Sequence, residues 1–231
     1  MDASAVARHG NDLGALSHPR AMTRLADVER KMSALSKSLG PPPRTAGGAV
    51  SMVLRGRHVP EVLLIERAER EGDPWSGQIA FPGGRRTRGD RSPLETARRE
   101  TREEVGIGLT RGARLLGWLP PRYPANRVDW VVVPFAFHVS RPPAPRPGDE
   151  AARAFWVPLD GLPATLRKAV IELPEGELET PAFEAGGKPL WGFTFRVLCD
   201  LFDLVGWPAD AGATPVPDRV GGVGRGVGDT P

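Results

Sequence analysis

Three glutamates in the middle of the chain have the spacing of a metal-binding cluster. Glu100, Glu103 and Glu104 stand at positions i, i+3 and i+4, so on an α-helix they share one stripe, where like charges repel one another. Carboxylate oxygens gathered in this way suit a hard divalent cation such as Mg²⁺. Taken alone, the cluster fits a solvated acidic helix face better, because the arginines around the glutamates would relieve their repulsion.

The surrounding residues predict the helix that must carry the cluster. Ser92 is a hydroxyl N-cap, Pro93 is a favoured first helical residue, and Glu95 stands three residues after the cap, as in a capping box. Gly106 is a natural C-terminal stop. We therefore expect a helix over Ser92–Val105. Its apolar side is formed by Leu94, Ala97, Thr101 and Val105.

A longer sequence pattern favours the metal-binding interpretation of the glutamates over the solvated helix face. The chain has Gly84, then Asp90, and then the run Arg99-Glu100-Thr101-Arg102-Glu103-Glu104-Val105-Gly106-Ile107. This stretch resembles the box of the Nudix hydrolase superfamily, G-x5-E-x7-R-E-U-x-E-E-x-G-U, in which U is a bulky aliphatic residue. It departs from the box in three ways. Asp90 replaces the first glutamate, the following spacer has eight residues, and Thr101 occupies the first U position.

The longer spacer resembles that of the coenzyme A pyrophosphatase branch of the superfamily. That branch also carries the upstream signature L-L-T-x-R-[SA]-x3-R-x3-G-x3-F-P-G-G, whose two ends match the segments 63–68 and 77–84 here. The middle differs, because one residue is added, Ile65 replaces the threonine, and Asp73 stands where the second arginine would fall. Three further segments, Trp118–Arg122, Phe155–Leu159 and Trp191–Arg196, also look like that branch.

The resemblance implies an α/β fold, specifically an α/β/α sandwich with a mixed β-sheet. It implies a pyrophosphohydrolase that uses Mg²⁺ or Mn²⁺. The implied metal ligands are Gly84, through its carbonyl, and Glu100, Glu103 and Glu104. Arg99 would orient a glutamate. Glu150 or a helix glutamate would serve as the base, although Glu150 is equally well explained as a loop acid.

The implied substrate is a small nucleotide, with coenzyme A or an acyl derivative favoured. The expected substrate-binding residues are Arg67, Arg86, Arg122 and Phe81. Arginine suits phosphate because its planar guanidinium can hold two oxygens. The imperfect signature leaves open another nucleotide substrate, such as a nucleotide sugar, a dinucleotide or a damaged nucleoside triphosphate. A module that binds a nucleotide without cleaving it is a third possibility, which the retained glutamates disfavour.

Composition divides the chain into four segments. We expect residues 1–20 to be disordered, 21–45 to form an amphipathic helix and a proline-rich linker, 46–206 to form the Nudix domain, and the glycine- and proline-rich 207–231 to be disordered. Strands are expected over Ala49–Arg55, Glu61–Glu66, Arg114–Leu119, Asp129–Val139 and Arg153–Pro158. Helices are expected over Ala21–Leu39 and Phe193–Val205, in addition to Ser92–Val105.

The remaining composition excludes several classes of protein. One cysteine in 231 residues rules out a disulfide framework. No apolar run approaches the ~20 residues of a membrane span, and no signal peptide is seen, so a cytoplasmic location is expected. A net charge of +3 without a basic block argues against a nucleic-acid partner. A homodimer is compatible with the sequence.

Overall fold

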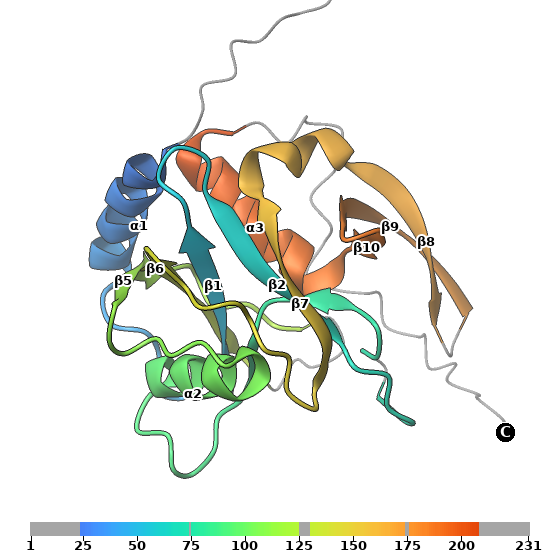
Figure 1. Ribbon diagram of the computed structural model, residues 1–231, viewed down its shortest axis with the longest axis horizontal. Helices are drawn as coiled ribbons and strands as arrows, with labels where there is room; N and C mark the ends of the chain where they lie inside the picture. The colour runs from blue at the N-terminus through green and yellow to red at the C-terminus, as the bar shows by residue number, and fades with distance from the viewer. Residues whose placement is uncertain (1–23, 74, 125–129, 174–175, 208–231) are drawn as a thin grey trace, which may run out of the picture.

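The computed structural model describes residues 24–73, 75–124, 130–173 and 176–207 of the chain. Within them, a seven-stranded mixed sheet forms the centre (Figure 1). Its strands are β1 (Gly48–Arg55), β2 (Glu61–Arg67), β3 (Ile79–Ala80), β4 (Gly83–Arg85), β5 (Ala113–Trp118), β6 (Val132–Val139) and β7 (Ala151–Pro158). The main order is β3-β2-β1-β6-β5, with β4 paired to β1 and β7 paired to β2.

The middle of the sheet is apolar on both faces. β1 and β6 run parallel to each other, and every residue of β6 is buried. Strands covered on both sides are near-continuous apolar runs, which is why both were visible in the sequence. The other described pairs of the sheet are antiparallel.

Helices cover both faces of this sheet. α2 (Pro93–Val105) packs on one face, where Ala97 and Val105 join a core that includes Phe135 and Phe137. α1 (Leu25–Leu39) and α3 (Gly192–Val205) pack on the other face, in a second core. The expected α/β/α sandwich with a mixed sheet is confirmed.

α1 is packed into the same body as the sheet. Its residues Leu25, Val28 and Met32 are buried. Gly117 of β5 lies so close to α1 that a Cβ there would be 2.7 Å from the carbonyl oxygen of Met32. The Ser36 hydroxyl also accepts a 2.8 Å hydrogen bond from the Trp118 amide. The segment before the proline-rich linker is therefore part of the core.

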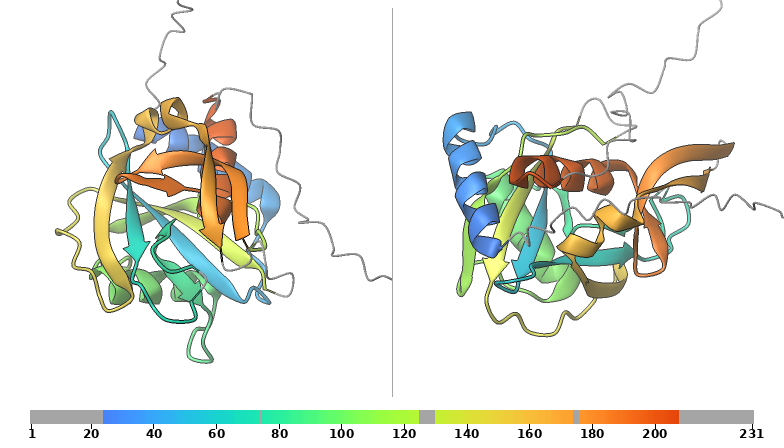
Figure 2. Two further views of the ribbon diagram at one scale, coloured as in Figure 1. Left: turned by 90° about the vertical axis from the view of Figure 1, so that its right-hand side faces the viewer. Right: turned by 90° about the horizontal axis from the view of Figure 1, so that it is seen from above.

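A second, antiparallel sheet was not expected from the sequence. It consists of β8 (Arg167–Leu173), β9 (Gly176–Ala185) and β10 (Lys188–Leu190), in the order β10-β9-β8. Two short 3₁₀ turns, Leu159–Gly161 and Pro163–Thr165, connect it to β7. Figure 2 shows this sheet on the side of the molecule away from α1, leading into α3.

Most expected elements agree with the structure, with shifted ends. α1 begins at Leu25, and residues 21–23 of its expected span lie outside the described residues. β6 begins at Val132 rather than at 129. The expected disorder of 1–20 and of 208–231 also falls outside the described residues. Trp207, the first residue of the segment expected to be disordered, is described, and its ring centre lies 5.4 Å from that of Phe202. No helix in the described part is long and apolar enough to cross a membrane; the cytoplasmic location and the homodimer stay predictions.

Candidate functional site

The helix that carries the glutamates begins and ends as its sequence predicts. The Ser92 hydroxyl accepts a 3.3 Å hydrogen bond from the Glu95 amide, with Pro93 as first residue. Gly106 ends the helix in the left-handed conformation, at φ 70°, and its amide donates to the Arg102 carbonyl. Because both ends are fixed, the side chains of the last turn have a defined direction.

Glu104 is the buried member of the cluster. Its residue is 2% exposed, and its Oε2 accepts a 2.8 Å hydrogen bond from the Gly83 amide. Its Oε1 is buried with no hydrogen-bond partner among the described residues. Burial, reinforced by the nearby Glu100 and opposed by the Gly83 amide, raises the pKa of this carboxyl to about 8. A buried acceptor without a partner is costly, so this oxygen is suited to a cation.

Glu100 and Glu103 become progressively more exposed. The Glu100 side chain is 14% exposed and that of Glu103 is 50% exposed. Burial raises the pKa of Glu100 above its usual range, opposed by Arg99 and reinforced by Glu103 and Glu150. The three carboxylates thus run from the protein interior to the surface.

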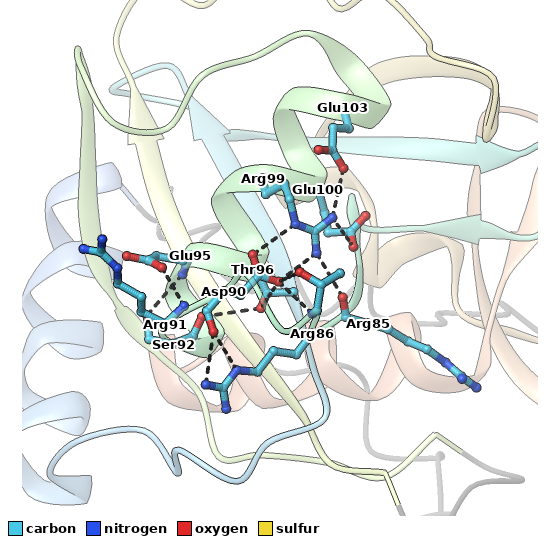
Figure 3. A network of polar contacts seen from close by, with 11 residues as sticks. Arg85, Arg86, Asp90, Arg91, Ser92, Glu95, Thr96, Arg99, Glu100 and Glu103 are labelled. Carbon is cyan, nitrogen blue, oxygen red and sulfur yellow. Dashed lines mark hydrogen bonds and ion pairs between the residues drawn. The ribbon is translucent and has the colours of Figure 1, made fainter.

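Arg99 connects the helix to the loop before it (Figure 3). Its guanidinium lies 2.9 Å from Glu100 and 2.9 Å from Glu103. It also donates to both carboxylate oxygens of Asp90, at 3.1 and 2.9 Å, and to the Arg85 carbonyl. These hydrogen bonds hold the pKa of Asp90 well below its usual range. Arg99 therefore fixes the direction of two of the glutamates, as expected for an orienting residue.

A glycine pair brings the backbone against the cluster. Gly83 and Gly84 form β4 with Arg85 and pair with β1. A Cβ on Gly84 would lie 2.6 Å from Oε1 of Glu100, so only glycine leaves room for that carboxylate. The Gly84 carbonyl lies near Gly48 of β1, and its role as a metal ligand stays a prediction.

The glutamates line one side of a cleft of about 510 Å³. Seven of the expected site residues line it, namely Arg67, Phe81, Gly84, Arg99, Glu100, Glu103 and Glu150. Glu104 lies beneath the cleft, where it is hydrogen-bonded to Gly83. The structure thus brings together most residues that the sequence singled out.

Two of the lining residues are held by a neighbouring loop. Arg67 lies 2.7 Å from Asp73, the acid that stands at the position of the signature's second arginine. The Glu150 carboxylate lies 3.4 Å from the Arg70 guanidinium. The segment between β2 and β3 therefore partly neutralises one expected phosphate-binding residue and one expected base.

Two expected substrate-binding arginines lie elsewhere, which is a correction to the sequence analysis. Arg86 donates to the carbonyls of Asp90 and Arg44. Arg122 forms a bidentate ion pair with Asp200 of α3. Neither lines the cleft as described. Isolated arginines are as often structural partners as ligand contacts, and these two have structural partners.

Several lining residues were missed or underweighted. Trp75, Trp130 and Trp191 line the cleft together with Arg85, whose guanidinium lies 5.2 Å from the centre of the Trp130 ring. Phe193 and Thr194, at the start of α3, also reach it. Aromatic residues in strand-like segments are usually core, so only the tertiary arrangement identifies these as cleft residues.

Comparison with known proteins places the chain in a family. The family model described as the NUDIX domain matches residues 45–174, more than half of the chain. The chain belongs to the Nudix family. The family expected from the box is thereby confirmed, and with it the class of Nudix hydrolases.

Three relatives in this family show how far the likeness extends. An uncharacterized protein of Schizosaccharomyces pombe, C14C4.10c, is 41% identical over 45% of this chain and 33% of its own length. The uncharacterized Nudix hydrolase NudL of Pectobacterium atrosepticum is 30% identical over 62% of this chain and 75% of its own. The human mitochondrial coenzyme A diphosphatase NUDT8 is 31% identical over 65% of this chain and 66% of its own.

The chain therefore spans a third of the yeast relative and about two thirds of the human one. Among solved structures, a MutT/nudix family protein from Enterococcus faecalis is 19% identical, with a TM-score of 0.44 over 78% of this chain and 72% of that one. The family assignment rests on the sequence match.

The structure accommodates two departures from the Nudix box. Asp90 replaces a glutamate yet reaches Arg99 with both oxygens, while Thr87 and Thr96 donate to its Oδ2. Thr101, at an aliphatic position, is fully buried, and its hydroxyl donates to the Ala97 carbonyl at 2.7 Å. A threonine with its hydroxyl satisfied inside the helix packs much as a valine would.

The donor set fits a divalent cation. Glu100, Glu103 and Glu104 offer carboxylate oxygens from neighbouring positions of α2, and one of these oxygens, Oε1 of Glu104, is buried without a hydrogen-bond partner among the described residues. Hard cations prefer oxygen ligands. Among the described residues, no three acidic, histidine or cysteine side chains are yet close enough together to enclose an ion. Glu100 and Glu103 are instead paired with Arg99, and Glu104 accepts from the Gly83 amide.

Proposed function

We propose that this Nudix protein hydrolyses the diphosphate linkage of a nucleoside diphosphate derivative, with coenzyme A or an acyl-coenzyme A as the favoured substrate. Water would attack one phosphorus and the bridging P–O bond would break, giving 3′,5′-ADP and phosphopantetheine or its acyl form. The observation that carries the proposal is the carboxylate cluster at the cleft, with the unpartnered oxygen of Glu104 at its base. The 31% identity to a relative named as a coenzyme A diphosphatase supports the substrate.

Each proposed role follows from the position of a residue. Glu100, Glu103 and Glu104, with the Gly84 carbonyl, would hold Mg²⁺ or Mn²⁺. When bound, such an ion offsets the negative charge that develops at phosphorus and lowers the pKa of water. Arg99 would keep the glutamates in place. Glu150 would accept the proton of the attacking water once Arg70 releases it, since it lies at the cleft and is half exposed.

The two ends of the substrate would meet different walls of the cleft. Arg67 and Arg85 would bind phosphate oxygens through charge-assisted hydrogen bonds. The rings of Phe81, Trp75 and Trp130 would contact the organic part, since aromatic faces stack well on a base. Arg86 and Arg122 are not assigned a substrate role, because neither lines the cleft.

Asp73 favours a second candidate, a different nucleotide substrate. Coenzyme A carries a 3′-phosphate in addition to its diphosphate, and an acid 2.7 Å from Arg67 reduces the positive charge available for it. A nucleotide sugar or a dinucleotide has no such phosphate and would be less affected. The non-catalytic binding module is disfavoured, because a module that only binds has no use for three clustered carboxylates.

The deciding experiment is a hydrolysis assay over a panel of substrates, with products separated by chromatography. Coenzyme A, its 3′-dephospho form, a nucleotide sugar, a dinucleotide and a nucleoside triphosphate would be compared with Mg²⁺ and with Mn²⁺. We expect coenzyme A to give the highest kcat/KM. Equal rates with the dephospho form, or faster cleavage of another nucleotide, would assign the second candidate. If none of these substrates is cleaved, the proposal that the protein is a hydrolase is wrong.

A further inference from the structure

A second cleft lies at the other end of β1 and is unrelated to the glutamates. It has a volume of about 640 Å³ and shares no lining residue with the first among those described. Val50, near the start of β1, lines the glutamate cleft, whereas Arg57 and His58, just beyond its end, line the second. The β1–β2 turn meets the beginning of α1 there (Figure 1), and the Leu25 amide donates to the Arg57 carbonyl at 3.1 Å.

The lining of this second cleft is strongly basic. Arg24, Arg57 and Arg114 contribute three guanidinium groups, and Glu29, paired with Arg114, is the acid among the described lining residues. Within the described part of the chain, the side chains of Arg24 and Arg57 have no hydrogen bond or ion pair. Arg24 and Arg57 are thus two cations in the second cleft without a paired acid among the described residues.

The start of α1 adds to this positive potential. Arg24 is the N-cap of the helix and makes no side-chain cap. The N-terminus of a helix carries partial positive charge and favours anions; here the Leu25 and Asp27 amides already donate to the carbonyls of Arg57 and Arg24, so the helix contributes through its dipole. The positive charge of Arg24 at the N-cap therefore has an unfavourable interaction with the helix dipole. A bound anion would offset this repulsion.

A buried histidine supplies a second, independent observation. His138 of β6 is 6% exposed, lines this cleft, and has an Nε2 atom with no hydrogen-bond partner among the described residues. Burial lowers its pKa, and the cationic neighbours Arg114 and Arg57, which line the same cleft, lower it too. An unpaired ring nitrogen beside guanidinium groups is satisfied when an acidic oxygen enters, because the imidazole can then donate.

We propose that this second cleft binds the phosphate group of a small phosphorylated molecule, held by Arg24, Arg57, His58, His138 and the N-terminus of α1. Guanidinium groups and helix N-termini are both preferred phosphate ligands. The volume exceeds what a free phosphate needs and lies in the range of small-molecule sites. The described lining holds no tryptophan, tyrosine or phenylalanine, so the cleft recognises the phosphate and offers no platform for a base.

The test is isothermal titration calorimetry on the full-length protein, with inorganic phosphate and, separately, adenosine 3′,5′-bisphosphate as ligands. The buffer contains a chelator that removes divalent ions. The double variant Arg24→Gln/Arg57→Gln removes the two unpaired cations, both of which are exposed. The matched control Arg88→Gln/Arg102→Gln removes two exposed cations elsewhere. Arg85→Gln removes a cation from the glutamate cleft and reports any binding there.

We expect the Arg24→Gln/Arg57→Gln variant to bind at least about tenfold more weakly than wild type, since it loses two charge-assisted hydrogen bonds. The Arg88→Gln/Arg102→Gln variant should retain wild-type affinity, and any loss of affinity in Arg85→Gln measures the share of binding that occurs at the glutamate cleft. The imidazole resonances of His138, assigned by their loss in His138→Gln, should shift with phosphate in wild type and stay fixed in Arg24→Gln/Arg57→Gln.

Two results would overturn the proposal. One is that wild type binds neither probe at millimolar concentration. The other is that Arg24→Gln/Arg57→Gln keeps its affinity, or loses no more than the matched control. If the second cleft binds both probes, the probe with the lower Kd shows whether its ligand is free phosphate or a phosphate monoester. None of these outcomes depends on hydrolysis, so the proposed function can fail while this site stands.

Discussion

At the scale of single residues, the main surprise is the burial of Glu104. The sequence placed it on an acidic stripe with Glu100 and Glu103, and that stripe exists. Its depth was not predictable, because the group that holds it, the Gly83 amide, lies 21 residues away along the chain. A buried carboxylate that keeps one oxygen unpaired is a cost to folding unless function uses it.

We predict that Glu100→Gln and Glu104→Gln each lower kcat by roughly three orders of magnitude, equivalent to about 4 kcal/mol of barrier. The amide keeps the shape of the side chain and removes the charge that a cation needs. The assay is hydrolysis of the best substrate at saturating metal. Glu172→Gln, an exposed acid on β8, is the matched control. Wild-type turnover in either helix variant would refute the metal assignment.

We also predict an unusual pH dependence of stability in metal-free protein. The folded pKa of Glu104 is about 8, against 4.5 for the free side chain, so between these pH values the folded state holds a proton that the unfolded state has lost. This group therefore makes the free energy of unfolding fall as pH rises from about 4.5 to 8, by up to about 1.4 kcal/mol per pH unit. Above pH 8 its contribution is constant.

Denaturant unfolding at several pH values measures this effect. Glu104→Gln should unfold with a flatter pH profile than wild type, and saturating Mg²⁺ should flatten the wild-type profile in the same way. Glu172→Gln should keep the wild-type slope. If Glu104→Gln and wild type show the same slope without metal, the buried carboxyl is ionised throughout and the argument for its protonation is wrong.

At the scale of elements, β4 and the last turn of α2 form one unit. The glycine pair in β4 has two different reasons to be glycine. At Gly84 a Cβ would meet the carboxylate of Glu100, which is the flexible end of a side chain. At Gly83, with φ 158°, a Cβ would lie 2.5 Å from the Ala49 carbonyl oxygen and 2.6 Å from the Cα of Val50, which cannot move aside.

We therefore predict opposite outcomes for two similar variants. Gly84→Ala should keep a near-wild-type unfolding temperature and lose about 100-fold in kcat, because Glu100 is displaced by about 1 Å or more. Gly83→Ala should lose about 2 kcal/mol or more of stability, because backbone must shift. Thermal unfolding and steady-state kinetics on both proteins distinguish these effects. A fully active Gly84→Ala would show that the position of Glu100 is not critical.

The elements differ in how much of them the sequence could predict. α2 has its own start and stop signals, Ser92-Pro93 and Gly106, so its ends were predictable to within a residue. β1 and β6 are apolar runs and were also found. β8 and β9 were not, because their exposed residues, such as Val170 and Leu178, and their charged ones break the alternation of a half-buried strand. Pairs such as Arg122–Asp200, 78 residues apart, leave no local signal.

At the scale of the whole molecule, the glutamate cleft is assembled from distant parts of the chain. α2 supplies Glu100 and Glu103, and β4 supplies the glycine pair. The end of β2 and the segment after it supply Arg67 and Trp75, and the residue before α3 and the start of α3 supply Trp191 and Phe193. The unexpected second sheet therefore has a consequence for the site, because β10 leads the chain to this wall. The family match over residues 45–174 ends before that wall is complete.

The last prediction concerns how much of the chain this assembly needs. Residues 1–20 and 208–231 contain none of the Nudix motifs and have no apolar periodicity, so ordering them would cost entropy without burial to offset it. A protein trimmed to residues 21–207 should keep kcat/KM within about twofold, well under the tenfold that 1.4 kcal/mol represents, and should unfold at the same temperature. Removing 208–231 alone is the control that separates the two ends. A large loss of activity on removing only that glycine-rich segment would mean that it acts in catalysis or in closing the cleft over the substrate.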